Sequence, residues 1–521
     1  MPSDGEISQS QAILTQEAAS TPQSDEESTV LSQRSEMLAT REQAYRVPGE
    51  VWEMIFSICS TLDRYSFRVE CGPGEETQNV HLPALVLSQV CARWRGIMKS
   101  SPRLWSSISI EFIHLPFDIV PILELYFVGS KDYPLDIRII RDSDYVYSLP
   151  PPLSKHDLSA WRTLSQHMPR CRNLSFRLAH IDLPEIGGLS FPRLESVCEE
   201  AVRYDSGEEK SSWLWQALER SPILTRVSLF EFHHALPLSR LTSLELRCVM
   251  AREVGLLLDV LPTCERLEHL SLRGLDDSDM DLVVLRHAEA PSSFRKISIS
   301  GEDYTPLWED NLLLSSLLEA LSMPSLVCIE LRCTGRPPSL LTTAKQSPRL
   351  ERVHLMLHCP AASQSPSHTL VPFLRSLRNL MHLELTTNPV GHPPYSDEVL
   401  VAVLSLLERR PDSSVCFPEL KSLSLRLSCV TLDCAVVEKV LQALSDRCSA
   451  SRTLKEFCLL VNPMLERNEL EQIESAMLGP ALVQRIRRVE QDYGIIIAIE
   501  DIYVASPRWR FLAEALTHQR W

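Results

Sequence analysis

The sequence predicts an α/β protein in which a small three-helix module precedes an irregular strand–helix solenoid. One spacing of apolar residues recurs from about residue 170 to residue 475, and apolar helical segments separate its copies. The chain has 521 residues, more than one compact core usually holds, so several domains or an elongated repeat are expected. We therefore divide the chain into residues 1–45, 46–112, 113–169, 170–475 and 476–521.

Residues 1–45 are predicted to be disordered. They are rich in Ser, Gln, Thr and Glu, and they carry eight acidic residues against two bases, Arg34 and Arg41. Such a segment buries too little apolar surface to offset the entropy lost on ordering.

Residues 46–112 predict three short helical pieces. The first runs from Pro48 to about Ser60, because proline suits the first turn of a helix and apolar residues follow at helical spacing. Residues 61–81 are polar and are expected to form an inserted loop. A second helix is predicted from Pro83 to Met98, then a short turn that starts at Pro102 and a strand in SSISIEF.

The repeated unit further along the chain is an apolar residue followed by others three and five positions later. In LTSLELRC these are Leu241, Leu244 and Leu246, and the spacing recurs in segments such as SPRLERVHL and FPELKSLSL. Segments such as NLLLSSLLEALSMP, which suit apolar helices, lie between the copies. Strands alternating with helices are typical of solenoids, and also of an ordinary parallel α/β sheet. We favour the solenoid because no glycine-rich strand–helix turn is present. Residues 113–169 are expected to connect the module to the repeats, and residues 476–521 to cap them.

The module carries more large apolar side chains than so small a bundle can bury. Aromatic residues among arginines, as in QVCARWRGIMKSSPRLW, are typical of interface centres. Its four bases, Arg93, Arg95, Lys99 and Arg103, are expected at the edge of such an interface or on a solvated helix face. Nucleic-acid binding is a third reading of these bases, which the formal net charge of −16 opposes.

Three segments of the module carry a family resemblance: V-P-x-E-V-W-x-x-I-F, L-x-L-S-Q-V-C-x-R-W-R-x-I and S-P-R-L-W. Together they resemble an F-box domain, particularly that of F-box proteins from mushroom-forming fungi, which often continue into irregular leucine-rich-type repeats. The L-x-x-L-x-L segments resemble a leucine-rich repeat in turn. The chain departs from the F-box pattern at Val47, where leucine is usual, and in its long inserted loop.

The resemblance implies the substrate-recognition subunit of an SCF-type cullin–RING ubiquitin ligase. Such a protein binds an SKP-type adaptor, and through it a cullin scaffold, while its repeats bind a protein substrate of unknown identity. A non-enzymatic repeat scaffold without a link to ubiquitination is the alternative. The residues onto which the resemblance maps adaptor contact are Val47, Pro48, Val51, Ile55, Phe56, Leu85, Val90, Trp94, Leu104 and Trp105.

A solenoid would expose strand side chains on a concave face, where partners of such repeats bind. The candidates for substrate contact lie between or beside the apolar strand positions. They are Glu245, Arg247, His269, Arg273, Glu330, Arg332, His354, Glu384 and Lys421.

Catalytic, cofactor, metal and membrane functions find little support. The chain has 16 glycines, and it lacks the phosphate-binding, zinc-protease and serine-hydrolase motifs. We therefore expect neither an enzyme nor a cofactor, and no nucleic-acid or membrane partner. The 15 cysteines include no C-x-x-C pair, which favours reduced thiols and a cytoplasmic or nuclear location.

Overall fold

The structure is a computed structural model of the whole chain. It describes residues 47–61, 65–71, 78–112, 115, 117–141, 153–178, 189–200, 212–233, 236–280, 283–301, 312–334, 340–358, 367–388, 394–407, 416–428, 434–462 and 480–501. The segment predicted to be disordered, residues 1–45, lies outside these ranges, as do residues 502–521 of the predicted cap.

Four helical pieces begin the described chain: α2 (Gly49–Thr61), α3 (Pro83–Val90), α4 (Ala92–Ser100) and the 3₁₀ turn η1 (Pro102–Trp105). The single helix expected from Pro83 to Met98 is therefore two helices. Cys91 breaks it, because its backbone is extended (φ −156°, ψ 169°) and its Sγ accepts a hydrogen bond from the Trp94 backbone N–H at 3.4 Å. The thiol thus takes the capping place that a serine or aspartate usually fills.

The polar segment 61–81 is expected from its sequence to be a loop, and this expectation is wrong for part of it. It contains β1 (Phe67–Cys71) and β2 (Gln78–His81), which pair antiparallel. Phe67 and Val69 alternate with polar residues and are fully buried, which gives β1 one apolar face. β1 also pairs in parallel with β3 (Ser107–Glu111), so the inserted segment joins the main sheet.

The main sheet has seventeen strands within the described ranges, and all its pairs except β1 with β2 are parallel. The strands after β3 are β4 (Leu135–Arg141), β5 (Cys171–Leu178), β6 (Ser196–Glu199), β7 (Arg226–Leu229), β8 (Ser243–Leu246), β9 (Val249–Met250), β10 (His269–Asp276), β12 (Lys296–Gly301), β14 (Cys328–Thr334), β15 (Arg352–His358), β16 (His382–Asn388), β17 (Ser422–Ser428), β18 (Glu456–Asn462) and β19 (Ile496–Asp501). The short strands β11 (Ala288–Glu289) and β13 (Leu321–Ser322) pair separately.

Helices alternate with these strands along the chain. The α-helices after α4 are α5 (Val120–Ser130), α6 (Lys155–His167), α7 (Ser212–Glu219), α8 (Ala251–Val260), α9 (Leu312–Ala320), α10 (Leu340–Gln346), α11 (Ser367–Ser376), α12 (Pro394–Leu407), α13 (Cys434–Ala450) and α15 (Pro480–Tyr493). Short 3₁₀ turns η2 (Met168–Arg170), η3 (Leu238–Arg240) and η4 (Leu261–Thr263) complete the set.

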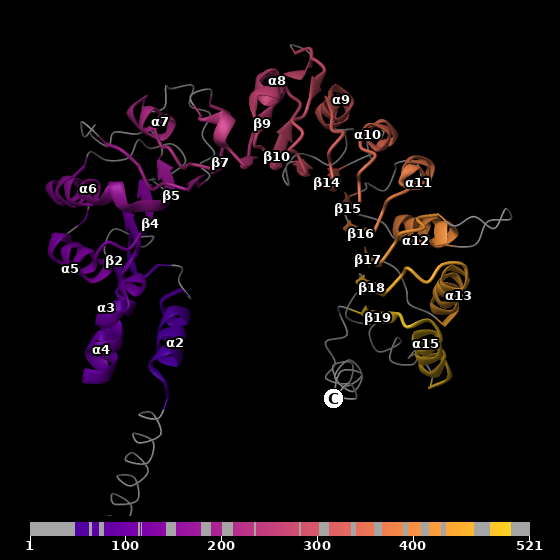
Figure 1. Cartoon of the computed structure of the whole chain (residues 1–521), viewed down its shortest axis with the longest axis horizontal. Helices are drawn as coiled ribbons and strands as arrows, with labels where there is room; N and C mark the ends of the chain where they lie inside the picture. The colour runs from indigo at the N-terminus through magenta and orange to yellow at the C-terminus, as the bar shows by residue number, and fades with distance from the viewer. Residues whose placement is uncertain are drawn as a thin grey trace, which may run out of the picture.

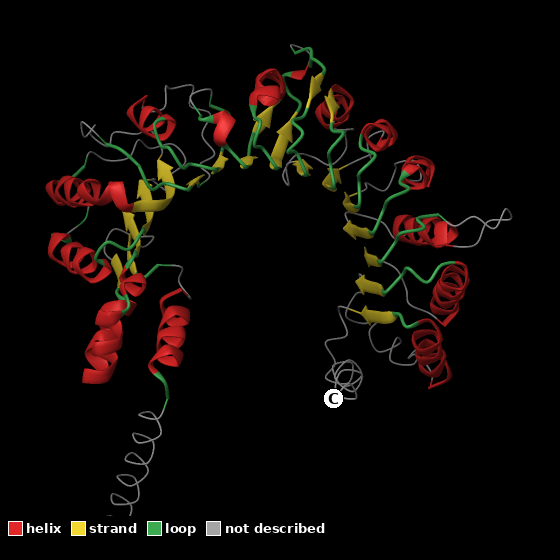
Figure 2. Ribbon diagram, in the orientation of Figure 1, coloured by secondary structure: helices red, strands yellow, loops and turns green. Residues whose placement is uncertain are grey.

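The chain forms an arc, with the strands along its inner side and the helices from α5 onward along its outer side (Figure 1, Figure 2). From β3 to β8, then through β10 and β12 to β19, each strand pairs with the next in chain order. This arrangement is compatible with a strand–helix solenoid. The predicted α/β class is thus confirmed, and the structure shows that its strands form one large, mostly parallel sheet. The ladder already includes β3 and β4, earlier than the repeats recognised in the sequence, and β19 extends it at the C-terminal end.

The core lies between the strands and the outer helices. Successive strands place apolar residues in register, for example Leu270, Ile297, Ile329 and Val353, and all four are buried. The alternate side chains face the inner side of the arc. One long core cluster runs from Phe56 on α2 to Ile497 on β19, so the N-terminal helices and the array are packed as one body.

Candidate functional site: N-terminal helices and concave face

Three aromatic side chains form the inside of the N-terminal helices. The ring of Trp94 on α4 lies 5.0 Å from Trp52 and 4.8 Å from Phe56, and the last two are 5.6 Å apart. Phe56 is fully buried, and Trp94 is half-buried against the core. Aromatic rings at these separations stabilise one another beyond their buried area. Trp94 therefore holds α4 against α2.

Trp105 joins these helices to the array. Its indole Nε1–H donates a hydrogen bond to the Met98 carbonyl at 2.8 Å, and its ring meets Tyr126 of α5 edge-on at 5.1 Å. Tyr126 in turn packs edge-on against Phe67 of β1 at 5.2 Å and donates from its hydroxyl to the Ser66 carbonyl at 2.7 Å. Burial raises the pKa of Tyr126, although a backbone hydrogen bond involving Leu85 lowers it. The phenol therefore stays neutral and serves as a hydrogen-bond donor.

Burial divides the ten residues predicted to contact an adaptor. Phe56, Leu104 and Trp105 are buried in the core of this structure, which leaves their side chains little surface to offer a partner. Pro48, Ile55 and Val90 are exposed. The rest, Val47, Val51, Leu85 and Trp94, are half-buried.

Other exposed apolar residues on the same helices are not among the contacts predicted from the sequence. Met54 and Ile58 on α2 are each 55% exposed, and Val86 on α3 is 60% exposed. Together with Ile55 and Val90 we name them the α2–α3 apolar residues. Helical periodicity marks an apolar stripe but not which part of it faces outward. Exposed patches of large apolar side chains are typical of interaction surfaces.

The bases near these helices have structural partners. Arg93 donates a hydrogen bond to the Val47 carbonyl, and Arg95 Nε donates to the Ser88 carbonyl at 3.1 Å. Arg103 lies 3.9 Å from Glu53 of α2, in an exposed ion pair. These contacts hold α2, α3, α4 and η1 together, so Arg93, Arg95 and Arg103 are more than a solvated helix face.

The nine predicted substrate-facing residues lie on or beside six strands along the inner side of the arc. Glu245 is on β8 and Arg247 directly follows it, while His269 and Arg273 are on β10. The others are Glu330 and Arg332 on β14, His354 on β15, Glu384 on β16, and Lys421, which immediately precedes β17. The register places Glu330, His354 and Glu384 side by side on three neighbouring strands.

Many of these side chains pair with one another across strands. Glu245 accepts a hydrogen bond from Arg247 at 3.1 Å and forms an ion pair with Arg273 of the neighbouring strand at 3.3 Å. Glu384 lies 3.8 Å from His354 and 3.3 Å from Arg426 of β17, and Glu330 pairs with Lys296 of β12 at 2.6 Å. Arg426 and Lys296 were not among the predicted residues, since only the register shows which strand positions become neighbours.

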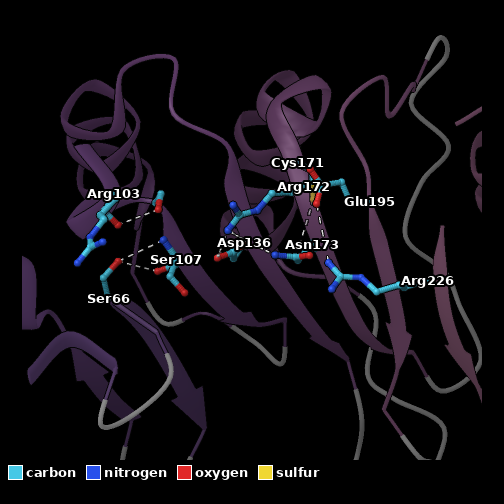
Figure 3. Close-up of polar contacts among 10 residues, drawn as sticks. Ser66, Arg103, Ser107, Asp136, Cys171, Arg172, Asn173, Glu195 and Arg226 are labelled. Atoms are coloured by element: carbon cyan, nitrogen blue, oxygen red, sulfur yellow. Dashed lines mark hydrogen bonds and ion pairs between the residues drawn. The ribbon is translucent and has the colours of Figure 1, made fainter. Parts of the chain in front are cut away.

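Polar side chains also line the N-terminal strands, and Figure 3 shows those around Asp136. Asp136 of β4 accepts hydrogen bonds from Asn173 at 2.5 Å and Arg172 at 3.4 Å. Glu200, just after β6, accepts from Arg138 Nε at 2.7 Å and Ser175 at 2.6 Å. Burial raises the pKa of Glu200, but these hydrogen bonds and the positive charge of Arg138 lower it more, so the carboxylate stays ionised.

Within the described ranges, no group of three or more His, Cys, Asp or Glu side chains could hold a metal ion. Burial raises the pKa of the Cys264, Cys328 and Cys448 thiols, which makes them poor nucleophiles. Among the helices described here, none combines the length and the apolar composition needed to cross a membrane.

The chain matches no protein-family model, and no curated protein matches its sequence.

Proposed function

We propose that this protein is a non-enzymatic substrate receptor of an SCF-type ubiquitin ligase. In this proposal the N-terminal helices are an F-box module that binds an SKP-type adaptor. The strand–helix array is a leucine-rich-repeat-like solenoid that binds a protein substrate. The observation that carries it is the exposure of the α2–α3 apolar residues, on helices whose sequence resembles an F-box.

The packing of the N-terminal helices supports their role as a binding module. The aromatic residues Trp52, Phe56 and Trp94 face one another, which leaves Met54, Ile55 and Ile58 on the outside of α2. Water contact at such side chains is unfavourable by about 25 cal/mol for each Å² of apolar surface, so burial against another chain is stabilising. A repeat scaffold with no role in ubiquitination is the competing reading, and it would use the same exposed residues with a different partner.

The test is co-purification of the full chain with an SKP-type adaptor. The informative variant is Ile58→Asp/Val90→Asp, because both side chains are exposed and a charge there should block an apolar interface without disturbing the core. The matched control is Leu256→Asp/Val401→Asp on α8 and α12. Ile58 and Leu256 are each 55% exposed, and Val90 and Val401 are 57% and 59% exposed.

We expect the wild type and the control to retain adaptor, and the Ile58/Val90 variant to lose about tenfold or more of its affinity. Each buried aliphatic side chain is worth roughly 1.5–3 kcal/mol when fully buried, so two partly exposed ones suffice for that loss. A wild-type chain that captures no adaptor refutes the proposal. Trp94→Ala is less informative, because it also removes the ring that holds α4 against α2.

If the adaptor binds, the scaffold reading makes a separate prediction. Proteins bound to the array would then keep their abundance when the proteasome is inhibited. A substrate receptor predicts that at least one of them accumulates.

A further inference from the structure

The part of the concave face between β8 and β17 carries an excess of positive charge, although the chain as a whole has a formal net charge of −16. The strands β8, β10, β12 and β14 to β17 each have three positions, on the strand or directly after it, whose side chains face the inner side of the arc and alternate with buried leucine, isoleucine or valine. Within these described positions, six bases stand against three acids. The bases are Arg247, Arg273, Lys296, Arg332, Arg352 and Arg426, and the acids are Glu245, Glu330 and Glu384.

Four of these bases occupy the last of the three inward-facing positions of their strand. We name them the arginine row: Arg247, Arg273, Arg332 and Arg426. The register aligns Arg273 with Ser300 and Arg332, and Arg332 with Met356, Thr386 and Arg426. The side chains between the arginines are therefore uncharged, and two of them are short. Neighbouring strands lie about 4.8 Å apart, so the row runs across roughly 30 Å.

The glutamates beside the row orient the guanidinium groups. Glu245 binds both Arg247 and Arg273, and Glu384 binds Arg426. The side chains of Arg273 and Arg426 are nevertheless 58% and 54% exposed. A guanidinium has five N–H donors, so the carboxylate beside Arg273 or Arg426 leaves other donors for a second anion. Arg247 also donates to the Glu199 carbonyl and to Cys198 Sγ, each at 3.5 Å.

We infer that the arginine row binds an acidic, extended peptide segment that runs across the strands of the concave face. This inference rests on the proposed function, since it names the substrate class of the same array. Carboxylates on alternate residues of an extended chain lie on one side of it and can reach successive arginines. The interspersed glutamates favour a peptide over a nucleic acid, because a continuous phosphate backbone could not avoid them.

The experiment measures fluorescence anisotropy of a labelled peptide with the purified full chain and no adaptor present. The probe is about twelve residues of alternating glutamate and serine, long enough to span the row at roughly 3.3 Å per residue. The reference peptide replaces every glutamate with glutamine. Because the adaptor is absent, failure here leaves the adaptor test unaffected, and failure there leaves this one unaffected.

Two variants are expected to change the affinity in opposite directions. Arg273→Gln/Arg332→Gln/Arg426→Gln should weaken glutamate-peptide binding about tenfold, since each lost ion pair contributes roughly 0.5 kcal/mol. Glu245→Gln/Glu384→Gln should strengthen it about threefold, because the competing carboxylates are gone. A merely structural role for these pairs would weaken binding in both cases.

The matched control is Arg220→Gln/Arg252→Gln/Arg286→Gln, three exposed arginines away from the inward-facing strand positions, and it should bind like the wild type. Far-ultraviolet circular dichroism checks that every variant folds. If the triple variant does not fold, Arg426→Gln alone replaces it, and it should weaken binding at least about twofold. Equal binding of the glutamine peptide overturns the inference, as does unchanged affinity in the arginine variant or weaker binding in the glutamate variant. The inference would also be overturned, in favour of a nucleic-acid interface, if a single-stranded oligonucleotide bound more tightly than the glutamate peptide and lost this affinity in the arginine variant.

Discussion

Replacing Gly129 by alanine tests how the N-terminal helices are joined to the array. Gly129 lies near the end of α5, directly over the buried ring of Trp105. A Cβ atom placed there would lie 2.7 Å from Trp105 Cδ2, 2.8 Å from Cγ and 3.1 Å from Cε3. Carbon atoms pack at about 3.5–4.0 Å, so the ring or the helix would have to move by close to 1 Å.

Neither the ring nor the helix can move freely. The Trp105 indole is fixed by its hydrogen bond to the Met98 carbonyl, and its ring also contacts the buried ring of Tyr126 on the same helix as Gly129. Overpacking of this kind costs roughly 1–3 kcal/mol, while alanine gains up to about 1 kcal/mol over glycine in helix propensity. We therefore expect Gly129→Ala to lower the free energy of unfolding of this region by about 1–2 kcal/mol.

Hydrogen exchange measured by mass spectrometry is the suitable assay, because an elongated array need not unfold in one step. Amides of α5, α4 and η1 should lose protection in Gly129→Ala, while those of β15 to β18 should keep it. Gly96→Ala on α4 is the matched control, since a methyl group at Gly96 would have no atom within 4 Å and the change should stabilise the helix. Unchanged or increased protection around Trp105 in Gly129→Ala would refute this account of the joint.

Three further outcomes follow from single side chains. Because burial raises the pKa of Tyr126, the folded chain keeps its phenol neutral, while the unfolded chain ionises it near pH 10. Stability should therefore fall as the pH rises above about 10, and the urea midpoint of Tyr126→Phe should fall less than that of the wild type between pH 8 and pH 10.5. Parallel curves for the two proteins would contradict this. Asp157 is fully buried, accepts a hydrogen bond from the Leu115 backbone N–H at 3.1 Å and forms a capping box with Ser154. Asp157→Ala should therefore lower the free energy of local opening of α6, measured by hydrogen exchange, by about 2–3 kcal/mol, and a loss below about 0.5 kcal/mol would contradict that role. The Cys59 thiol on α2 is exposed, so iodoacetamide should alkylate it readily. Under the proposed function, a bound adaptor should slow this alkylation. An equal rate with and without the adaptor would place the adaptor contact elsewhere.

The repeat pattern in the sequence was sufficient to locate most of the sheet. In RNLMHLEL the spacing of Leu380, Leu383 and Leu385 marks a strand, and all three are buried where β16 lies. The same holds for the helical segments between copies, because a long apolar run between two such strands can bury its side chains only as a helix over the sheet. Local pattern and overall packing agree there.

The N-terminal part of the sheet was harder to predict. In β3 the first apolar position of the unit is a tryptophan, Trp105, ahead of Ile108 and Ile110, and in β4 that position is Pro134, ahead of Ile137 and Ile139, so neither strand resembles the leucine-rich later copies. β1 is five residues long and lies between charged segments, so its two buried residues, Phe67 and Val69, gave too short a signal. Pairing with β3 stabilises this strand, and that contact is distant in sequence.

The candidate site shows the same limit. An apolar stripe on α2 and α3 was visible, but which residues face inward depends on where Trp94 and Trp105 pack, and neither position follows from helical spacing. On the concave face, Glu245 and Arg273 could be named individually, whereas their pairing required the register of β8 against β10.

The joint at Trp105 has a mechanical consequence. Since the α2–α3 apolar residues and the arginine row belong to one packed core and one continuous ladder, two partners bound at these places would be held at a constant separation and a constant relative orientation. Removing one internal strand–helix unit would shorten the ladder by about 4.8 Å and rotate everything beyond it. The number of units would thus determine the reach between the two partners, as the length of a rigid arm determines the position of its end.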